Sequence, residues 1–261
     1  MAKGIAVNTD YKKRFMNGIK ILCRTRNIYE VWQDTMYMFA ASIANASILP
    51  LTKNKDFKNV WENREREYKR LINKYNKKEQ KLFPQMFSLI VMELEKNPWQ
   101  DLLGSIYMDL EISSKDRGQF FTPYSICELM SDVTMSKKQI AKVVHEKGYA
   151  SINDCACGAG ATLIAAAERC SELFKKLNYQ NHVYFVAQDV DNTVANMCYI
   201  QLSLHGLAGY VAVGNTLTEP VVTDLNRIWF TPMWFSDVWS MRRLFHGQDA
   251  LGREIKRKDE R

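Results

Sequence analysis

From about residue 150 the sequence alternates between strand-like and helix-like segments, and this alternation limits the fold more than any other feature. "YASINDCA", "HVYFVAQDVD" and "GYVAVGNTL" read as three strands, and "NRIWFTPMWF" reads as a fourth that runs into a turn. Helix-like segments, "ATLIAAAERCSELFKKL" and "NTVANMCYIQLSLHGL", separate the first three. Strands that alternate with helices predict a parallel sheet with right-handed crossovers. The expected fold class is therefore α/β.

The first 115 residues have a different texture, with few glycines and helical spacing of apolar residues. "VWQDTMYMFAASIANASIL" is one such segment and is closed by Pro50, and a long charged amphipathic segment over 57–83 is followed by Pro84. The basic face of the second segment has two readings, a phosphate-binding surface or a solvated helix face, and the solvated face is favoured. We predict a helical domain over 1–115 and an α/β domain over 116–261.

Composition limits the partners and the compartment. The net charge of +7 favours a polyanionic partner such as nucleic acid. An uncharged apolar stretch of about 18 residues is lacking, as is an apolar signal region in "MAKGIAVNTDYKKRF", so neither a membrane span nor secretion is expected. The six cysteines are scattered, which is typical of reduced thiols in a cytoplasm.

The turn after the first strand, "DCACGAGA" from Asp154, invites two interpretations. Cys155 and Cys157 suggest a metal or redox site, but zinc needs about four ligands and redox pairs have a different spacing. Cys170 lies well along the next helix, and the nearest histidine lies beyond it. Small residues at the start of a helix instead let a ligand approach free backbone amides. We therefore predict a ligand-binding turn and no metal.

Polar residues also follow the next two strands, where ligands of parallel sheets bind. Asp189 is the candidate for holding two ribose hydroxyls, with Asp191 as the spare. The alternative, an acid that caps the following helix, suits Asp191 better. Asn215 could bind an adenine, although a Gly-Asn pair at a strand end is more often only a turn.

A further segment, "GQFFTP", precedes the predicted sheet. Pro123 suits the first turn of a helix, and Thr122 can cap that helix. Capping does not explain the two aromatic residues beside them.

Together these segments resemble the N6-adenine DNA methyltransferases that use S-adenosylmethionine, and in particular the modification subunit of type I restriction systems. Five segments typical of that family occur in order across about 100–217, namely "GQFFTP", "DCACGAGA", "AQDVD", "IQLSLHGL" and "GNTL". The resemblance implies a Rossmann-like methyltransferase sheet behind a helical N-terminal domain. It also implies S-adenosylmethionine as cofactor and DNA as partner.

The resemblance also assigns cofactor contacts. Asp154 would organise the turn and face the cofactor's amino group, Asp189 would hold the ribose, and Asn215 would meet the adenine. The other implied residues are Gln119, Phe120, Phe121, Thr122, Pro123 and Tyr124 at the methionine end, and Cys157, Gly158, Ala159 and Gly160 in the turn. Cys155 stands where the family has proline and Ala161 where it has glycine, and both are small enough to be tolerated.

The family's catalytic segment, [DN]-P-P-[FYW] after the fourth strand, is replaced by "TPMW". In the family, an amide or carboxylate oxygen and a proline carbonyl accept the hydrogens of the adenine amine, and the aromatic ring stacks on the flipped base. Thr231, Pro232 and Trp234 are the corresponding candidates here. About thirty residues follow Phe230, so we expect a C-terminally shortened sheet. A partner subunit would then supply target recognition or the missing half of the sheet.

Three functions stay open at this point. The first is an adenine-N6 DNA methyltransferase of unusual form, completed by a second subunit. The second is an inactive, methylase-derived subunit that binds S-adenosylmethionine or DNA or has a regulatory role. The third is a structural protein with a relic fold and no cofactor.

Overall fold

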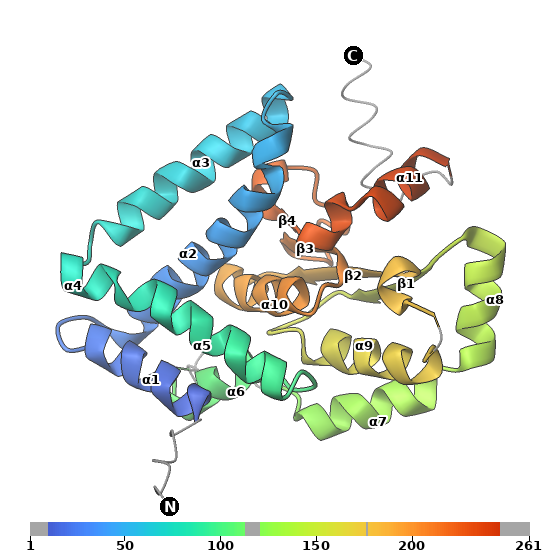
Figure 1. Cartoon of the computed structure of the whole chain (residues 1–261), viewed down its shortest axis with the longest axis horizontal. Helices are drawn as coiled ribbons and strands as arrows, with labels where there is room; N and C mark the ends of the chain where they lie inside the picture. Colours follow the sequence, from blue (N-terminus) through green and yellow to red (C-terminus); the bar gives the residue numbers. More distant parts are fainter. Residues whose placement is uncertain (1–9, 113–120, 176, 246–261) are drawn as a thin grey trace, which may run out of the picture.

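A computed structural model describes residues 10–112, 121–175 and 177–245 (Figure 1). The N-terminal part is helical, as predicted from its apolar spacing. Its elements are α1 (Tyr11–Leu22), α2 (Ile28–Ile48), the 3-10 turn η1 (Leu49–Leu51), α3 (Lys55–Ile72), α4 (Lys77–Gln80), α5 (Leu82–Lys96) and α6 (Leu102–Asp109).

Side-chain caps set where several of these helices begin. Asn27 and Asn54 each accept a hydrogen bond from the first turn of the helix that follows, and Asn76 forms a reciprocal capping box with Glu79. The capping box divides the charged segment 57–83, so that segment does not form one helix. The end of the segment already belongs to α5, and Pro84 lies within the first turn of that helix. At this position the missing N–H of proline costs no hydrogen bond.

The second part of the chain builds the sheet and its helices. Its elements are α7 (Tyr124–Thr134), α8 (Lys137–Lys147), β1 (Ala150–Asp154), α9 (Ala161–Leu173), η3 (Tyr179–Asn181), β2 (Val183–Asp189), α10 (Asn192–Leu204), β3 (Ala208–Val213), η4 (Leu225–Arg227), β4 (Ile228–Phe230), η5 (Pro232–Phe235) and α11 (Asp237–Phe245). None of the helices in the described ranges is both long enough and apolar enough to cross a membrane.

The sheet has the order β1-β2-β3-β4. The first three strands are parallel, as expected, with Ala150 opposite Val183 and Tyr184 opposite Ala208. The expectation of a wholly parallel sheet is wrong for the fourth strand, which runs antiparallel to β3. The described connection from β3 to β4 contains the short 3-10 turn η4 but no α-helix, so β4 can return beside β3 without a crossover.

Helices cover the two faces of the sheet unequally. Both crossover helices, α9 and α10, lie on one side, and α11 lies on the other (Figure 1). Phe185 belongs to the core cluster under α9 and α10, whereas its neighbour Tyr184 packs with Trp239 of α11. Successive side chains of a strand point to opposite faces, which produces this division.

One hydrophobic cluster joins the helical part to the sheet. It runs from Phe15 and Trp32 to Met197 and Phe185, and the Trp32 indole donates to the Met197 sulfur at 3.4 Å. The region 11–109 is helical as predicted, while the domain boundary at residue 115 stays a prediction.

Gln201 of α10 adds a polar link between the two parts. Its side-chain amide donates to the Asp101 carboxylate and to the Ala159 carbonyl, both at 2.8 Å, and its oxygen accepts from the Leu103 amide at 3.0 Å. Gln201 and Asp101 are buried, and burial raises the pKa of Asp101.

Helix α3 closes the β4 side of the sheet. The buried Arg64 guanidinium donates to the Ile228 carbonyl at 2.7 Å and lies 4.1 Å above the Trp229 ring. All three residues of β4 are buried. The outer edge of β4 is thus covered by a helix and a cation.

Replacing Arg64 with alanine should lower the free energy of unfolding by about 2–3 kcal/mol, because the Ile228 carbonyl loses a charge-assisted donor and Trp229 loses a packed cation. Chemical denaturation measures this change. The exposed Arg66→Ala on the same helix is the matched control and should change the value by less than about 0.5 kcal/mol. Equal effects of the two variants would contradict the closing role of Arg64.

Candidate functional site

The turn after β1 is held by the side chain of Asp154. One of its carboxylate oxygens accepts from the Ala156 amide at 3.0 Å, and the other accepts from the Thr162 hydroxyl. These bonds connect the strand end to the first turn of α9. The arrangement is the one expected of an acid that organises the turn.

Two glycines give this turn its shape. Gly158 has φ +51° and Gly160 has φ +96°, both in the left-handed region that glycine favours. A Cβ on Gly160 would stand 2.9 Å from the Cys198 sulfur, so this glycine permits α9 and α10 to approach. Gly160 is the N-cap residue of α9 and supplies no side chain, so the amides of the first turn have no side-chain cap there.

Asp189 lies against the same turn. Its carboxylate accepts from the Gly158 amide at 2.8 Å and from the Asp191 amide at 2.9 Å. Burial raises the pKa of Asp189, although both amides favour the ionised form. A carboxylate has about four acceptor positions, so these amides leave acceptor capacity for a ligand's hydroxyl groups. Asp191 caps α10 by accepting from the Thr193 and Val194 amides, which confirms the capping interpretation of that residue.

The loop after β3 joins this arrangement. The Thr216 hydroxyl donates to the Cys155 carbonyl at 2.8 Å, and the Gly214 amide donates to the Asp189 carbonyl at 2.9 Å. The exposed Asn215 accepts from the Leu217 amide through its side-chain oxygen, which is the turn-forming role that was its alternative. Its side-chain NH2 group is a donor that this bond does not use.

Two apolar side chains at the same strand ends were missed by the sequence analysis. Val190 follows β2 directly and is 72% exposed, and Leu217 is 93% exposed in the loop after β3. The available signal was an apolar residue between two acids in "QDVD" and another beside Asn215. Flat apolar surfaces of this kind suit a nucleobase.

Part of the "GQFFTP" segment also reaches the turn. Ring atoms of Phe121 lie 3.3 Å from the position of a Cβ on Gly158, and the ring packs against Tyr107. Pro123 is itself the N-cap of α7 and no side chain caps this helix, so the prediction that Thr122 caps it is wrong. The reason is that the helix starts one residue later than the Thr-Pro pattern predicts. Gln119 and Phe120 lie outside the described residues.

Tyr124 begins α7 and contacts α9. Its hydroxyl donates to the Glu168 carboxylate at 2.8 Å, and burial is the main cause that raises the pKa of Tyr124. Its role at the methionine end stays a prediction.

The structure does not bring Thr231, Pro232 and Trp234 to the carboxyl ends of β1, β2 and β3. Because β4 is antiparallel, its end lies beside the start of β3. Thr231 is fully buried there and exchanges hydrogen bonds with Gly209, and the Trp234 indole donates to the Tyr184 hydroxyl at 2.8 Å. Pro232 opens the 3-10 turn η5. These contacts give the segment a structural role at the end of the strands opposite to Asp154 and Asp189.

The cysteines are free thiols. Cys155 is exposed in the turn, whereas Cys157 is buried, and contact with the Cys198 thiol together with burial raises the pKa of Cys157. Within the described residues, no group of three or more His, Cys, Asp or Glu side chains could hold a metal.

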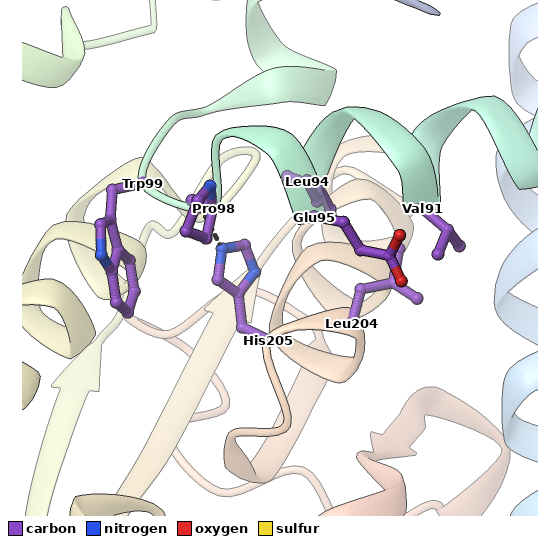
Figure 2. Close-up of a pocket in the computed structure, with 7 residues that line it drawn as sticks. All are labelled: Val91, Leu94, Glu95, Pro98, Trp99, Leu204 and His205. Carbon is purple, nitrogen blue, oxygen red and sulfur yellow. Dashed lines mark hydrogen bonds between the residues drawn. The ribbon is translucent and has the colours of Figure 1, made fainter.

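A separate pocket of about 290 Å³ lies at the far end of α10 (Figure 2). His205 lies in it between the Pro98 carbonyl, 2.5 Å from Nε2, and the Gln201 carbonyl, 2.7 Å from Nδ1, and its ring stacks on Trp99. His205 is the C-cap residue of α10, so the "LHG" part of the sequence pattern ends a helix.

Comparison with known proteins agrees with this geometry. Residues 98–249, more than half of the chain, match the N-6 DNA Methylase family. The chain belongs to this family. It is also similar to the type I restriction enzyme MpnII methylase subunit of Mycoplasma pneumoniae, with 29% identity over 136 residues. The match covers 49% of this chain and 22% of that relative, so the chain spans well under half of the relative's length.

Gly160→Ala should lower the free energy of unfolding by about 2–3 kcal/mol, because alanine is strained at this φ and its Cβ meets the Cys198 sulfur. Thermal denaturation measures the change. The same substitution made in a Cys198→Ala background should cost less, about 1–2 kcal/mol, because only the backbone strain remains. An unchanged stability of Gly160→Ala would contradict this account of the turn.

Proposed function

We propose that this member of the N-6 DNA methylase family binds S-adenosylmethionine at the carboxyl ends of β1, β2 and β3 and serves adenine-N6 methylation of DNA. The observation that carries the proposal is the convergence of Asp154, Gly158 and Asp189 in one hydrogen-bonded arrangement. Three properties of that arrangement fit this cofactor: open acceptor positions on a carboxylate, uncapped helix amides and glycines where a Cβ would intrude.

Each part of the cofactor then has a counterpart. Asp189 accepts hydrogen bonds from the ribose hydroxyls, and Val190 and Leu217 offer apolar surface to the adenine, with Asn215 donating to it. The turn 156–160, together with Phe121, holds the methionine end. When bound, the cofactor supplies an electrophilic methyl group.

Methylation of an adenine needs hydrogen-bond acceptors for its amine. The candidate residues for this role, Thr231 and Trp234, do not lie at the carboxyl ends of β1, β2 and β3 in the described chain. An adenine amine becomes nucleophilic when two acceptors bind its hydrogens and the base is held out of the duplex. Thr231 and Trp234 lie at the opposite end of the strands, where they bond to Gly209 and Tyr184. We therefore propose a cofactor-binding subunit of a type I-like modification complex, in which a partner completes the acceptor site and recognises the target sequence.

A catalytically inactive, regulatory subunit is the second candidate. The buried position of Thr231 favours it, because its hydroxyl accepts from the Gly209 amide at the opposite end of the strands. Transfer of labelled methyl groups to adenine-containing DNA, alone and with neighbouring gene products, separates the two functions. Transfer by an assembled complex supports the enzyme, and cofactor binding with no transfer in any combination supports the regulatory subunit.

Asp189→Asn should weaken binding of S-adenosylmethionine roughly 10- to 100-fold, because the ribose hydroxyls lose a charged acceptor. Isothermal titration calorimetry measures the affinity. Asp191→Asn is the matched control, since asparagine caps a helix as well as aspartate does, and it should bind like the wild type.

The pH dependence provides a second measure of the same prediction. Burial raises the pKa of Asp189, and only the ionised form accepts two hydrogen bonds well. Affinity should therefore be full above this raised pKa and fall as the pH is lowered through it, while Asp189→Asn should lack this step. Equal binding by Asp189→Asn and the wild type at neutral pH would refute the ribose assignment.

A further inference from the structure

The loop after β3 carries two of the residues that the proposed function assigns to the adenine, Asn215 and Leu217. The loop leaves the strand at Gly214 and returns to the sheet at Ile228, where β4 begins. Leu217 is 93% exposed, so this part of the loop buries little apolar surface of its own. Its position therefore depends on hydrogen bonds and ion pairs.

Glu219 is the residue on which these bonds converge. Its amide donates to the Asn215 carbonyl at 2.7 Å, which closes the turn around Leu217. Its carbonyl accepts from the Gln188 side chain of β2 at 2.9 Å. Its carboxylate accepts from both terminal nitrogens of Arg227, at 3.1 and 2.7 Å. Glu219 therefore connects the turn both to the sheet and to the segment that leads into β4.

Arg227 holds the other side of the loop. Its Nε donates to the Val213 carbonyl at the end of β3, at 2.9 Å, so all three guanidinium nitrogens are hydrogen-bonded. The guanidinium also lies against the loop backbone, since a Cβ on Gly214 would stand 2.7 Å from its Nη2. A planar guanidinium that binds a carboxylate through two nitrogens fixes direction as well as distance. Arg227 and Glu219 thus form a clamp across residues 213–219.

The clamp is exposed to solvent. The side chains of Arg227 and Glu219 are 39% and 38% exposed, and exposed ion pairs usually add little to the stability of a fold. Arg70 and Glu67 of α3 also pair through two guanidinium nitrogens and are 60% and 36% exposed. Of these two pairs, the clamp is the one that spans a loop, so its effect lies in the position that it gives to this loop.

The clamped loop also touches the glycine-rich side of the candidate site. The Thr216 hydroxyl donates to the Cys155 carbonyl in the turn after β1, at 2.8 Å. Asn215 and Leu217 lie on either side of Thr216, within the segment that the clamp holds. An ordered segment loses less conformational entropy on binding a ligand than a free one does. Loss of the clamp should therefore weaken binding of the part of the ligand that this segment contacts.

We propose that Arg227 is a positioning residue for the nucleobase, which through Glu219 holds Asn215 and Leu217 ready for the adenine of the cofactor. This inference rests on the proposed function. Because Arg227 itself does not contact the ligand, its loss should lower selectivity for the base and leave binding of the ribose and the amino-acid part unchanged.

The test compares two ligands that differ only in the base. S-adenosylhomocysteine carries adenine, and S-ribosylhomocysteine has a hydroxyl group in its place. The affinity of each is measured by displacement of labelled S-adenosylmethionine. Arg227→Ala should bind S-adenosylhomocysteine about 10-fold more weakly than the wild type does and should bind S-ribosylhomocysteine equally well. A variant that was only destabilised would lose affinity for both ligands by the same factor.

Three further variants define the role of the clamp. Arg70→Ala is the matched control and should leave both affinities unchanged. Arg227→Lys keeps the charge without the planar contact through two nitrogens and should recover only part of the selectivity. The double variant Arg227→Ala/Glu219→Ala should bind S-adenosylhomocysteine no more weakly than Arg227→Ala alone, because the two residues act as one unit.

Hydrogen exchange follows the loop without any ligand. The amides of Thr218 and Glu219 both donate to the Asn215 carbonyl. They should exchange at least about 10-fold faster in Arg227→Ala than in the wild type, whereas the amides of β2 should be unchanged. Unchanged exchange of the two loop amides would contradict the clamp.

The outcomes separate this role from the proposed function. Equal affinity of the wild type and Arg227→Ala for S-adenosylhomocysteine would overturn the positioning role and leave the cofactor site standing. An equal loss for both ligands would overturn it as well. Failure of the wild type to bind S-adenosylhomocysteine at all would refute the proposed function, and the role of Arg227 with it.

Discussion

The hydrogen bond from the Gly158 amide to the Asp189 carboxylate joins the ends of two neighbouring strands, and the rest of the candidate site is arranged around it. The left-handed backbone of Gly158 presents this amide, and the Asp191 amide holds the second oxygen of the same carboxylate. A carboxylate fixed by two donors keeps its remaining acceptor positions in a constant direction. Preorganisation of this kind lowers the cost of ordering when a ligand binds.

The two ends of the sheet have separate tasks. At the carboxyl ends of β1 to β3, the turns remain irregular and are tied to one another by backbone and hydroxyl bonds. At the other end, Thr231 and Gly209 exchange hydrogen bonds in a buried setting, and Trp234 packs over Phe230. This end therefore stabilises the sheet, and the proposed cofactor site lies at the opposite end of the strands.

The sequence predicted the features that depend on local chemistry. The alternation of strands and helices predicted the three parallel strands, and the place of Asp191 just before the helix-like segment "NTVANMCYIQLSLHGL" favoured its role as a cap. The direction of β4 was beyond such reasoning, because it depends on Arg64, Trp229 and Gly209, which are distant in the sequence. The prediction that Thr122 caps α7 was wrong because a Thr-Pro pair is compatible with two starting points of a helix. The hydrogen bond of Tyr124 to Glu168 favours the later starting point.

Gln201 gives the molecule a mechanical property that neither half has alone. One buried amide group holds Asp101 at the start of α6 and the Ala159 carbonyl in the glycine-rich turn. A displacement of α6 must therefore lengthen one of the two hydrogen bonds of the Gln201 amide or move the glycine-rich turn together with α6. The helical part therefore helps to fix the position of the turn, and a ligand that shifted α6 would also shift the Ala159 carbonyl.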